Sequence, residues 1–249
     1  MWKIGLMMLL TMLVDNGLQA QDVEVVTTDY PPFQMQQGHA VVGITTDLVR
    51  AVIQKTGLRA TLGLYPWNRA YERALNNPNI LIYSIARTPE REPLFKWVGT
   101  IAPFNVYFWK LKSRTDIVLN DLEDAKKYKI GGVLSDVKTQ YLVKKGFETG
   151  TRIETVHGDH LNFQKLMTGK LDLIPFDDMT FPFKASAAGW DLSLIPAEKA
   201  LFLPEISTEL YMAFSRGTED ALVDRFRTAL EELKAEGLPE KIKENYLPR

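Results

Sequence analysis

The segment Arg87-Thr88-Pro89-Glu90-Arg91 places two arginines directly after an apolar run at residues 80–83. The apolar run is typical of a buried strand, and Pro89 preceded by Thr88 predicts a helical turn that Thr88 caps. A strand that ends in such a turn offers backbone N–H groups and a partial positive charge. An arginine there adds a planar fork that matches a carboxylate. The segment therefore predicts a site for a small anion.

A second interpretation of the two arginines needs no ligand. Either could be solvated or paired with a neighbouring acid, Glu90 or Glu92. The five residues alone leave both interpretations open, so the choice depends on the elements around them.

The first half of the chain alternates strands and helices before a long apolar segment. Strands are predicted at 23–28, 59–65 and 80–85, and helices at 43–56 and 67–75. This alternation predicts a parallel sheet with right-handed crossovers. The mostly apolar run at 96–112 is too long for one ordinary strand and indicates a chain that crosses into another domain.

A second alternation follows. It predicts helices at 119–127, 137–146, 160–169 and 179–189 and strands at 129–134, 152–156 and 171–176, then a strand at 209–215 and a helix at 219–236. Two α/β halves with a double crossing predict two lobes. Because ligands of open α/β sheets bind beyond the carboxyl ends of the strands, we expect a binding cleft between the lobes.

Composition and the N-terminus limit the class of protein. Residues 1–20 combine one lysine, an apolar core and a closing Ala20, which predicts a cleaved signal peptide, with an uncleaved membrane anchor as the alternative. The chain has no cysteine, which excludes disulfides and thiolate metal sites. Its net charge of −1 offers no basic field for nucleic acid or lipid. We expect a secreted, periplasmic protein without a nucleic-acid partner.

The chain contains, in this order, TDYPPF at 28–33, GITTDLVRAVIQKTGL at 43–58, PWNRA at 66–70, RTPER at 87–91, GKLDLIPFDD at 169–178, YMAFSRGTEDAL at 211–222 and GLPEKIKENYL at 237–247. In these motifs and their order it resembles a type II periplasmic solute-binding protein of family 3, the receptors that serve polar amino acid ABC transporters. It implies a two-lobed α/β fold, each lobe a mainly parallel sheet flanked by helices, joined by a two-strand hinge. The expected boundaries are 21–104 and 208–249 for lobe 1 and 105–207 for lobe 2.

The resemblance also implies ligand contacts in the first lobe. Arg91 falls on the carboxylate-clamping arginine of the family, and Ser84 on a small polar residue that helps to hold the same group. Tyr30 falls on an aromatic that packs against the ligand, and Trp67 opens a helix whose first residues face the cleft.

In the second lobe the match is uneven. Asp177 falls on the acid that receives an α-ammonium. Ser135, also expected to contact the ligand, opens a segment, 135–138, where many members have a Gly-Thr-Thr turn. There, Asp136 could meet a cation, or Lys138 a second anion. Ala86 also replaces a hydroxyl of the family, and the family gives no role to Arg69 or Arg87, which could serve a ligand with additional negative charge.

Other site chemistry is not expected. Asp177 and Asp178 resemble a metal pair without a third ligand, and His157 and His160 are expected in a solvated loop, with Asp159 as a helix N-cap. Hydrolase, nucleotide-triphosphatase and dinucleotide motifs are absent from the sequence. We therefore expect neither metal nor cofactor.

The sequence thus favours a monomeric binding protein that passes a small polar ligand to an ABC permease. An enzyme on the same scaffold, similar to cyclohexadienyl dehydratase with Asp177 or Glu209 as acid–base residue, is one alternative. A sensory binding module is the other.

Overall fold

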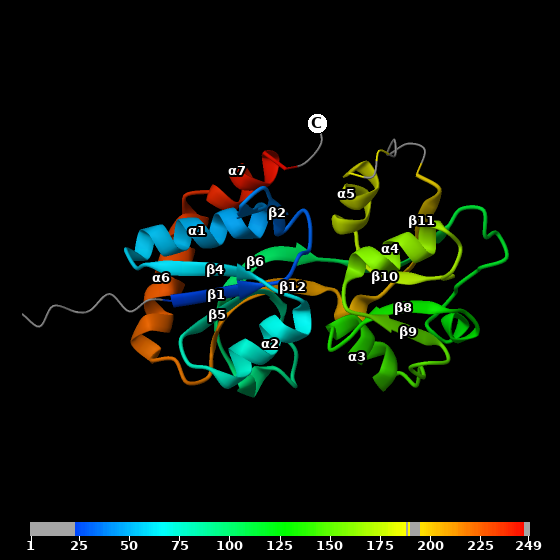
Figure 1. The fold of residues 1–249 in the computed structure, drawn as a ribbon, viewed down its shortest axis with the longest axis horizontal. Coiled ribbons are helices and arrows are strands. Elements are labelled where there is room, and N and C mark those ends of the chain that lie inside the picture. The colour runs from blue at the N-terminus through cyan, green and yellow to red at the C-terminus, as the bar shows by residue number, and fades with distance from the viewer. Residues whose placement is uncertain (1–22, 188, 190–194, 247–249) are drawn as a thin grey trace, which may run out of the picture.

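The computed structural model describes residues 23–187, 189 and 195–246, and their helices and strands form two groups that lie side by side (Figure 1). We call the group built around a five-stranded sheet lobe 1, and the group built around a three-stranded and a two-stranded sheet lobe 2. The predicted signal peptide at 1–20 lies outside the described residues. Within the described part of the chain, no helix is long and apolar enough to cross a membrane.

The sheet of lobe 1 has the strand order β4-β1-β5-β12-β6. β1 pairs in parallel with β4 and β5, whereas β12 is antiparallel to both β5 and β6. The sheet is therefore mixed, because a segment from late in the chain enters between two early strands. The strands are β1 (Val23–Thr27), β4 (Ala60–Leu64), β5 (Ile80–Ala86), β6 (Phe95–Phe104) and β12 (Thr208–Ser215).

Helices cover both faces of this sheet (Figure 1). Successive side chains of a strand point to opposite faces, and β5 shows this directly. Leu81 and Tyr83 belong to one buried cluster with residues of α1 and α6, whereas Ile80 and Ile82 pack with α2. This two-sided burial explains the continuous apolar run of β5. The helices are α1 (Ile44–Thr56), α2 (Trp67–Asn76), α6 (Asp220–Ala235) and α7 (Leu238–Glu244).

Gly43 sets the start of α1. Its φ of 130° and ψ of 167° lie in a region that is essentially confined to glycine. A Cβ atom there would lie 2.4 Å from the Phe33 carbonyl oxygen. The same carbonyl accepts hydrogen bonds from the backbone N–H of Thr45 (2.9 Å) and from its hydroxyl (2.8 Å). The close approach at Gly43 therefore ties α1 to the loop that follows β1.

Lobe 2 has β7 at the centre of an antiparallel sheet with the order β10-β7-β11, beside a parallel pair, β8 and β9. The buried aromatic rings of Trp109 and Phe181 stack with centroids 4.1 Å apart in its core. Its elements are β7 (Val106–Leu111), β8 (Ile130–Val133), α3 (Val137–Lys144), β9 (Ile153–Val156), α4 (Asp159–Met167), β10 (Ile174–Asp177), α5 (Thr180–Ala187) and β11 (Ala197–Phe202).

Some predicted elements differ from the structure. The helix predicted at 119–127 is only a 3-10 helix, Glu123–Lys127. Asp124 accepts hydrogen bonds from the backbone and side-chain nitrogens of Asn120, and such local bonds compete with a regular helix. The hairpin β2 (Met35–Gln37) and β3 (Ala40–Val42), and strand β11, were not predicted.

The chain passes between the lobes twice. It leaves lobe 1 at Asn105, between β6 and β7, and returns between β11 and β12 through the 3-10 helix η4 (Pro204–Ile206). The two passages are bonded to each other: Leu203 N–H donates to the Val106 carbonyl (2.9 Å), and Val106 N–H donates to Ser207 Oγ (2.9 Å). Paired connections of this kind can act as a hinge. The boundaries placed at residues 104 and 207 stay a prediction.

Candidate functional site

A small cavity lies between the lobes, beyond the carboxyl ends of strands from both sheets. On lobe 1 it is lined by the segment after β1, the end of β5 and the first residue of α2, Trp67. On lobe 2 it is lined by the segments that follow β8 and β9. Its volume is about 50 Å³, room for a few water molecules. The lobes are thus closed upon each other at the position where the alternation of strands and helices predicts a ligand cleft.

Arg91 is the buried cation of lobe 1 in this cavity, with only 2% of its surface exposed. Its guanidinium lies over the rings of Trp67 and Tyr71, 5.4 and 5.2 Å from their centroids. Nη1 donates to the Ala86 carbonyl at 3.2 Å, and Nε is buried without a hydrogen-bond partner. Burial lowers the pKa of Arg91. Among the described residues no carboxylate forms an ion pair with it. N–H groups of this guanidinium are therefore available to a ligand.

The other arginines considered from the sequence do not line the cavity. Arg87 forms a two-pronged ion pair with Glu92, with N–O distances of 2.7 and 2.6 Å, and lies over the ring of Trp97. Arg69 lies over the ring of Tyr65, 5.1 Å from its centroid. The interpretation of a self-paired arginine therefore holds for Arg87, whereas Arg91 keeps the geometry of an anion site.

The turn that carries Arg91 differs in part from its prediction. Thr88 Oγ1 accepts a hydrogen bond from the Arg91 N–H at 3.3 Å, which confirms the predicted cap. The Thr88 carbonyl also accepts from the N–H groups of Arg91 and Glu92, and the 3-10 helix that follows, η1 (Glu92–Leu94), has three residues. The N–H groups of Arg91 and Glu92 are therefore bonded within the turn and are not free for an anion, which leaves the Arg91 side chain as the donor of the predicted anion site.

Tyr30 and Asp177 connect the two lobes. The Tyr30 hydroxyl donates to Asp177 Oδ2 at 2.6 Å, and burial followed by the Asp177 charge raises the pKa of Tyr30 well above its usual value. Asp177 Oδ1 accepts from the N–H groups of Met179 (3.0 Å) and Thr180 (2.9 Å) at the start of α5. Tyr30 lines the cavity, whereas Asp177 stands behind it with both oxygens bonded.

Trp67 and Ser135 form a second connection across the lobes. Trp67 Nε1 donates to the Ser135 carbonyl at 2.9 Å, and Arg91 Nη2 lies 3.4 Å from the same oxygen. Ser135 has a left-handed φ of 58°, and its carbonyl points toward lobe 1. Ser135 therefore contacts lobe 1 through its backbone. Because the side chain takes no part, the residue type does not predict this contact.

We expect Trp67→Phe to shift the unliganded protein toward an open form. The change keeps the aromatic packing but removes one hydrogen bond between the lobes, a loss of about 1 kcal/mol or roughly a fivefold shift in the open-to-closed ratio. Small-angle scattering should show a larger radius of gyration. Trp97→Phe is the control, because its indole donates within lobe 1, to the Glu92 carbonyl. Equal radii for the two variants would contradict the assignment.

Ser84 also lines the cavity, in a left-handed conformation with a φ of 59°. Its hydroxyl lies 2.7 Å from Gln34 Oε1 and 3.0 Å from Thr45 Oγ1. Gln34 is fully buried, and the other end of its amide, Nε2, has no partner in the described chain. Sequence reasoning missed Gln34, although it directly follows the TDYPPF motif. It adds a polar group on the lobe 1 wall near Ser84.

Lys138 brings a second buried cation into the cavity, from lobe 2. Its Nζ lies 3.2 Å from Asp136 Oδ1 and 3.6 Å from Asp159 Oδ2. It also lies over the rings of Tyr30 and Phe104, 5.1 and 5.8 Å from their centroids. Burial lowers the pKa of Lys138, but the charges of Asp136 and Asp159 outweigh this and raise it above its usual value. Lys138 is therefore a cation at neutral pH.

The prediction that Asp159 caps a helix is wrong. Gly158 occupies the cap position of α4, and the Asp159 side chain, 11% exposed, faces Lys138 instead. Burial raises the pKa of Asp159 despite the opposing Lys138. His157 and His160 are exposed. In the part of the chain that the structure describes, no group of acidic and histidine side chains could hold a metal ion.

Comparison with known proteins identifies the family of this chain. The family of bacterial extracellular solute-binding proteins, family 3, matches residues 23–249. The chain belongs to this family. It is 24% identical over 225 residues to the arginine-binding extracellular protein ArtP of Bacillus subtilis (strain 168), a match that spans 88% of this chain and 83% of ArtP.

Solved structures confirm the two-lobed fold class. An ancestral arginine-binding protein bound to arginine superposes with a TM-score of 0.77 at 20% identity, covering 91% of this chain and 98% of that one. A histidine kinase sensor domain with similarity to periplasmic binding proteins gives a TM-score of 0.78 at 17% identity, with coverages of 91% and 96%. The type II fold of this family 3 chain is therefore also found in a solute-binding protein and in a sensor domain.

Proposed function

We propose that this chain is an extracytoplasmic receptor that holds a small polar carboxylate, an amino acid or a related acid, between its lobes and delivers it to an ABC permease. The observation that carries the proposal is Arg91, a buried guanidinium without an acidic partner among the described residues. A buried charge that stays unpaired is strongly unfavourable. An anion that arrives with the ligand would provide the missing partner.

The cavity residues take complementary roles in this proposal. Arg91 clamps the carboxylate, with Ser84 beside it on the lobe 1 wall. Tyr30 and Trp67 form the aromatic walls against which the ligand packs. Asp177 acts through Tyr30, whose hydroxyl it holds at 2.6 Å. The Ser135 carbonyl occupies two lobe 1 donors in the absence of ligand, and a ligand carboxylate would compete with it for Arg91.

Family membership supports action outside the cytoplasm, and the sequence at 1–20 supports export into the periplasm by a cleaved signal peptide. The arginine-binding relative supports an amino acid or a similar small acid as the ligand. We propose a monomer with one ligand site, because both lobes of a single chain line the cavity that holds Arg91. A binding role without catalysis is consistent with an Asp177 whose two oxygens are already bonded.

The test is calorimetry of the purified protein against amino acids, their 2-oxo and 2-hydroxy counterparts, and dicarboxylates. We expect saturable one-to-one binding of at least one carboxylate. The decarboxylated amine of the same side chain, which lacks the group that Arg91 recognises, should give no heat. Silence across all the carboxylates, or binding of the amines alone, would contradict the proposal.

Delivery and catalysis have separate readouts. Loss of uptake of the bound solute in cells that lack this chain would support delivery to a permease, and unchanged uptake would contradict it. Incubation with prephenate or arogenate, followed by NMR, tests the enzymatic alternative. Turnover that disappears in Asp177→Asn would replace the binding proposal with that alternative.

A further inference from the structure

Lys138 Nζ lies in surroundings of the kind that bind an ammonium group. Two carboxylates, Asp136 and Asp159, lie within 3.6 Å of it, and two aromatic faces, Tyr30 and Phe104, lie within 5.8 Å. Acidic groups combined with aromatic faces are the surroundings in which proteins bind ammonium ions. Here the cation belongs to the chain itself, in the first turn of α3, and it is 3% exposed.

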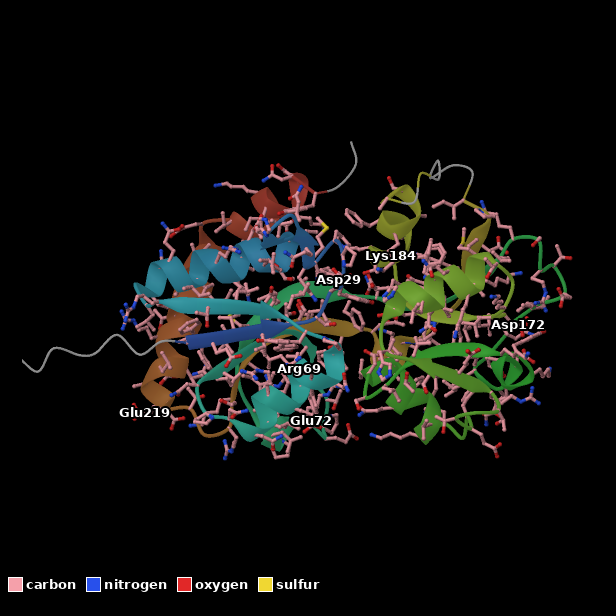
Figure 2. The ribbon with its side chains drawn as sticks, in the orientation of Figure 1. Asp29, Arg69, Glu72, Asp172, Lys184 and Glu219 are labelled. Carbon is pink, nitrogen blue, oxygen red and sulfur yellow. The ribbon has the colours of Figure 1, made fainter. Side chains whose placement is uncertain are left out.

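The other acids near the cavity offer little to a ligand cation. Asp177 accepts from the Tyr30 hydroxyl and from the N–H groups of Met179 and Thr180 at the start of α5. Asp29 lines the cavity but is exposed, and it lies across the lobe boundary from the half-buried Lys184 of α5 (Figure 2). An exposed carboxylate of this kind contributes little binding free energy.

The two buried cations therefore face a ligand together. Arg91 comes from lobe 1 and Lys138 from lobe 2, and both line the same small cavity. A ligand whose carboxylate meets Arg91 places the substituent on its α-carbon within the field of Lys138. An ammonium there would have to compete with Lys138 for Asp136 and Asp159, in a poorly hydrated site where charge interactions are strong.

We propose that Lys138 supplies the amino function from within the protein, so that the cleft selects small carboxylates without an α-ammonium group, such as 2-oxo acids, 2-hydroxy acids or dicarboxylates. This inference rests on the proposed function, because it concerns the same Arg91 cleft. It narrows the ligand to a class that differs from the amino acid of the arginine-binding relative.

The experiment compares matched ligands by calorimetry, each set sharing one side chain and differing only in an α-amino, α-hydroxy, α-oxo or unsubstituted α-carbon. For the wild-type protein we expect the members without the amino group to bind at least about tenfold more tightly. Lys138→Met keeps a chain of similar length without the charge and leaves Asp136 and Asp159 free for an ammonium. In this variant the preference should reverse toward the amino acid.

The control is Lys126→Met, the same change at a lobe 2 lysine that pairs with Glu123 away from the cavity, and it should keep the wild-type preference. Amino acids that bind the wild type as tightly as their deaminated counterparts would overturn the inference and leave the proposed carboxylate receptor intact. Failure of every carboxylate to bind would overturn both. If Lys138→Met does not fold, the wild-type comparison alone decides.

Discussion

Replacing Arg91 by alanine is expected to weaken ligand binding by about 2–5 kcal/mol, the usual loss when one partner of a buried, hydrogen-bonded charge pair is removed. That free energy corresponds to a roughly thirty- to several-thousand-fold higher Kd. The physical reason is that Arg91 is the cavity cation without an acidic partner in the described chain, so a ligand carboxylate would be left desolvated and unpaired. Calorimetry with the ligand found for the wild type measures the loss.

Two further substitutions make this test specific. Arg91→Lys should recover only part of the affinity, because an ammonium cannot reproduce the planar fork. Arg87→Ala changes an arginine of the same turn whose guanidinium is already paired with Glu92, and it should leave the Kd within about twofold of the wild type. An Arg91→Ala protein that binds like the wild type would show that the clamp lies elsewhere.

Gly43→Ala is expected to lower the free energy of unfolding by about 2–6 kcal/mol. The added Cβ would lie 2.4 Å from the Phe33 carbonyl oxygen, and both atoms belong to rigid backbone. About 1–3 kcal/mol is expected from the backbone angles at Gly43 and a similar amount from the forced overlap. Because Phe33 O also binds Thr45, the strain should reach the Thr45–Gln34 contact on the cavity wall. Urea unfolding measures the change.

Gly38→Ala provides the matched control for Gly43→Ala. Gly38 has a left-handed φ of 58°, but no atom lies within 4 Å of a Cβ at that position. Its substitution should therefore lose only the conformational preference, about 1–2 kcal/mol. Equal destabilisation by the two substitutions would mean that the Phe33 carbonyl moves away without loss and that the close approach at Gly43 is unimportant.

The elements that could be predicted from the sequence are those whose local pattern and tertiary role agree. The helical spacing between Gly43 and Gly57 and the apolar run of β5 are repeated in the structure almost residue for residue. β11 was not predicted because it is an edge strand with an irregular pattern of burial. Its register against β7 is also interrupted, between Lys199 and Leu201. Its burial pattern lacks the apolar alternation from which strands are predicted.

The same distinction applies to the candidate site. Arg91 could be predicted because its recognition chemistry lies in one short motif. The pairing of Lys138 with Asp159 could not be predicted, because these residues belong to two helices, α3 and α4, that only the folded sheet brings together. The acid at position 159 had a plausible local explanation as a helix cap. Local explanations of this kind fail where a buried charge at another point in the chain provides a stronger partner.

The position of β12 has a consequence for the order in which the two lobes can fold as the chain emerges. This strand pairs on one side with β5 and on the other with β6, yet it follows every element of lobe 2 in the chain. Because the chain emerges N-terminus first, from the ribosome and, under the proposed export, across the membrane, lobe 2 is complete while the lobe 1 sheet still lacks the strand that joins its parallel part to β6. Until Thr208–Ser215 emerges, β5 has an open edge and β6 has no partner strand, the feature by which emerging chains pair wrongly and aggregate. The N-terminal lobe is thus the last to mature.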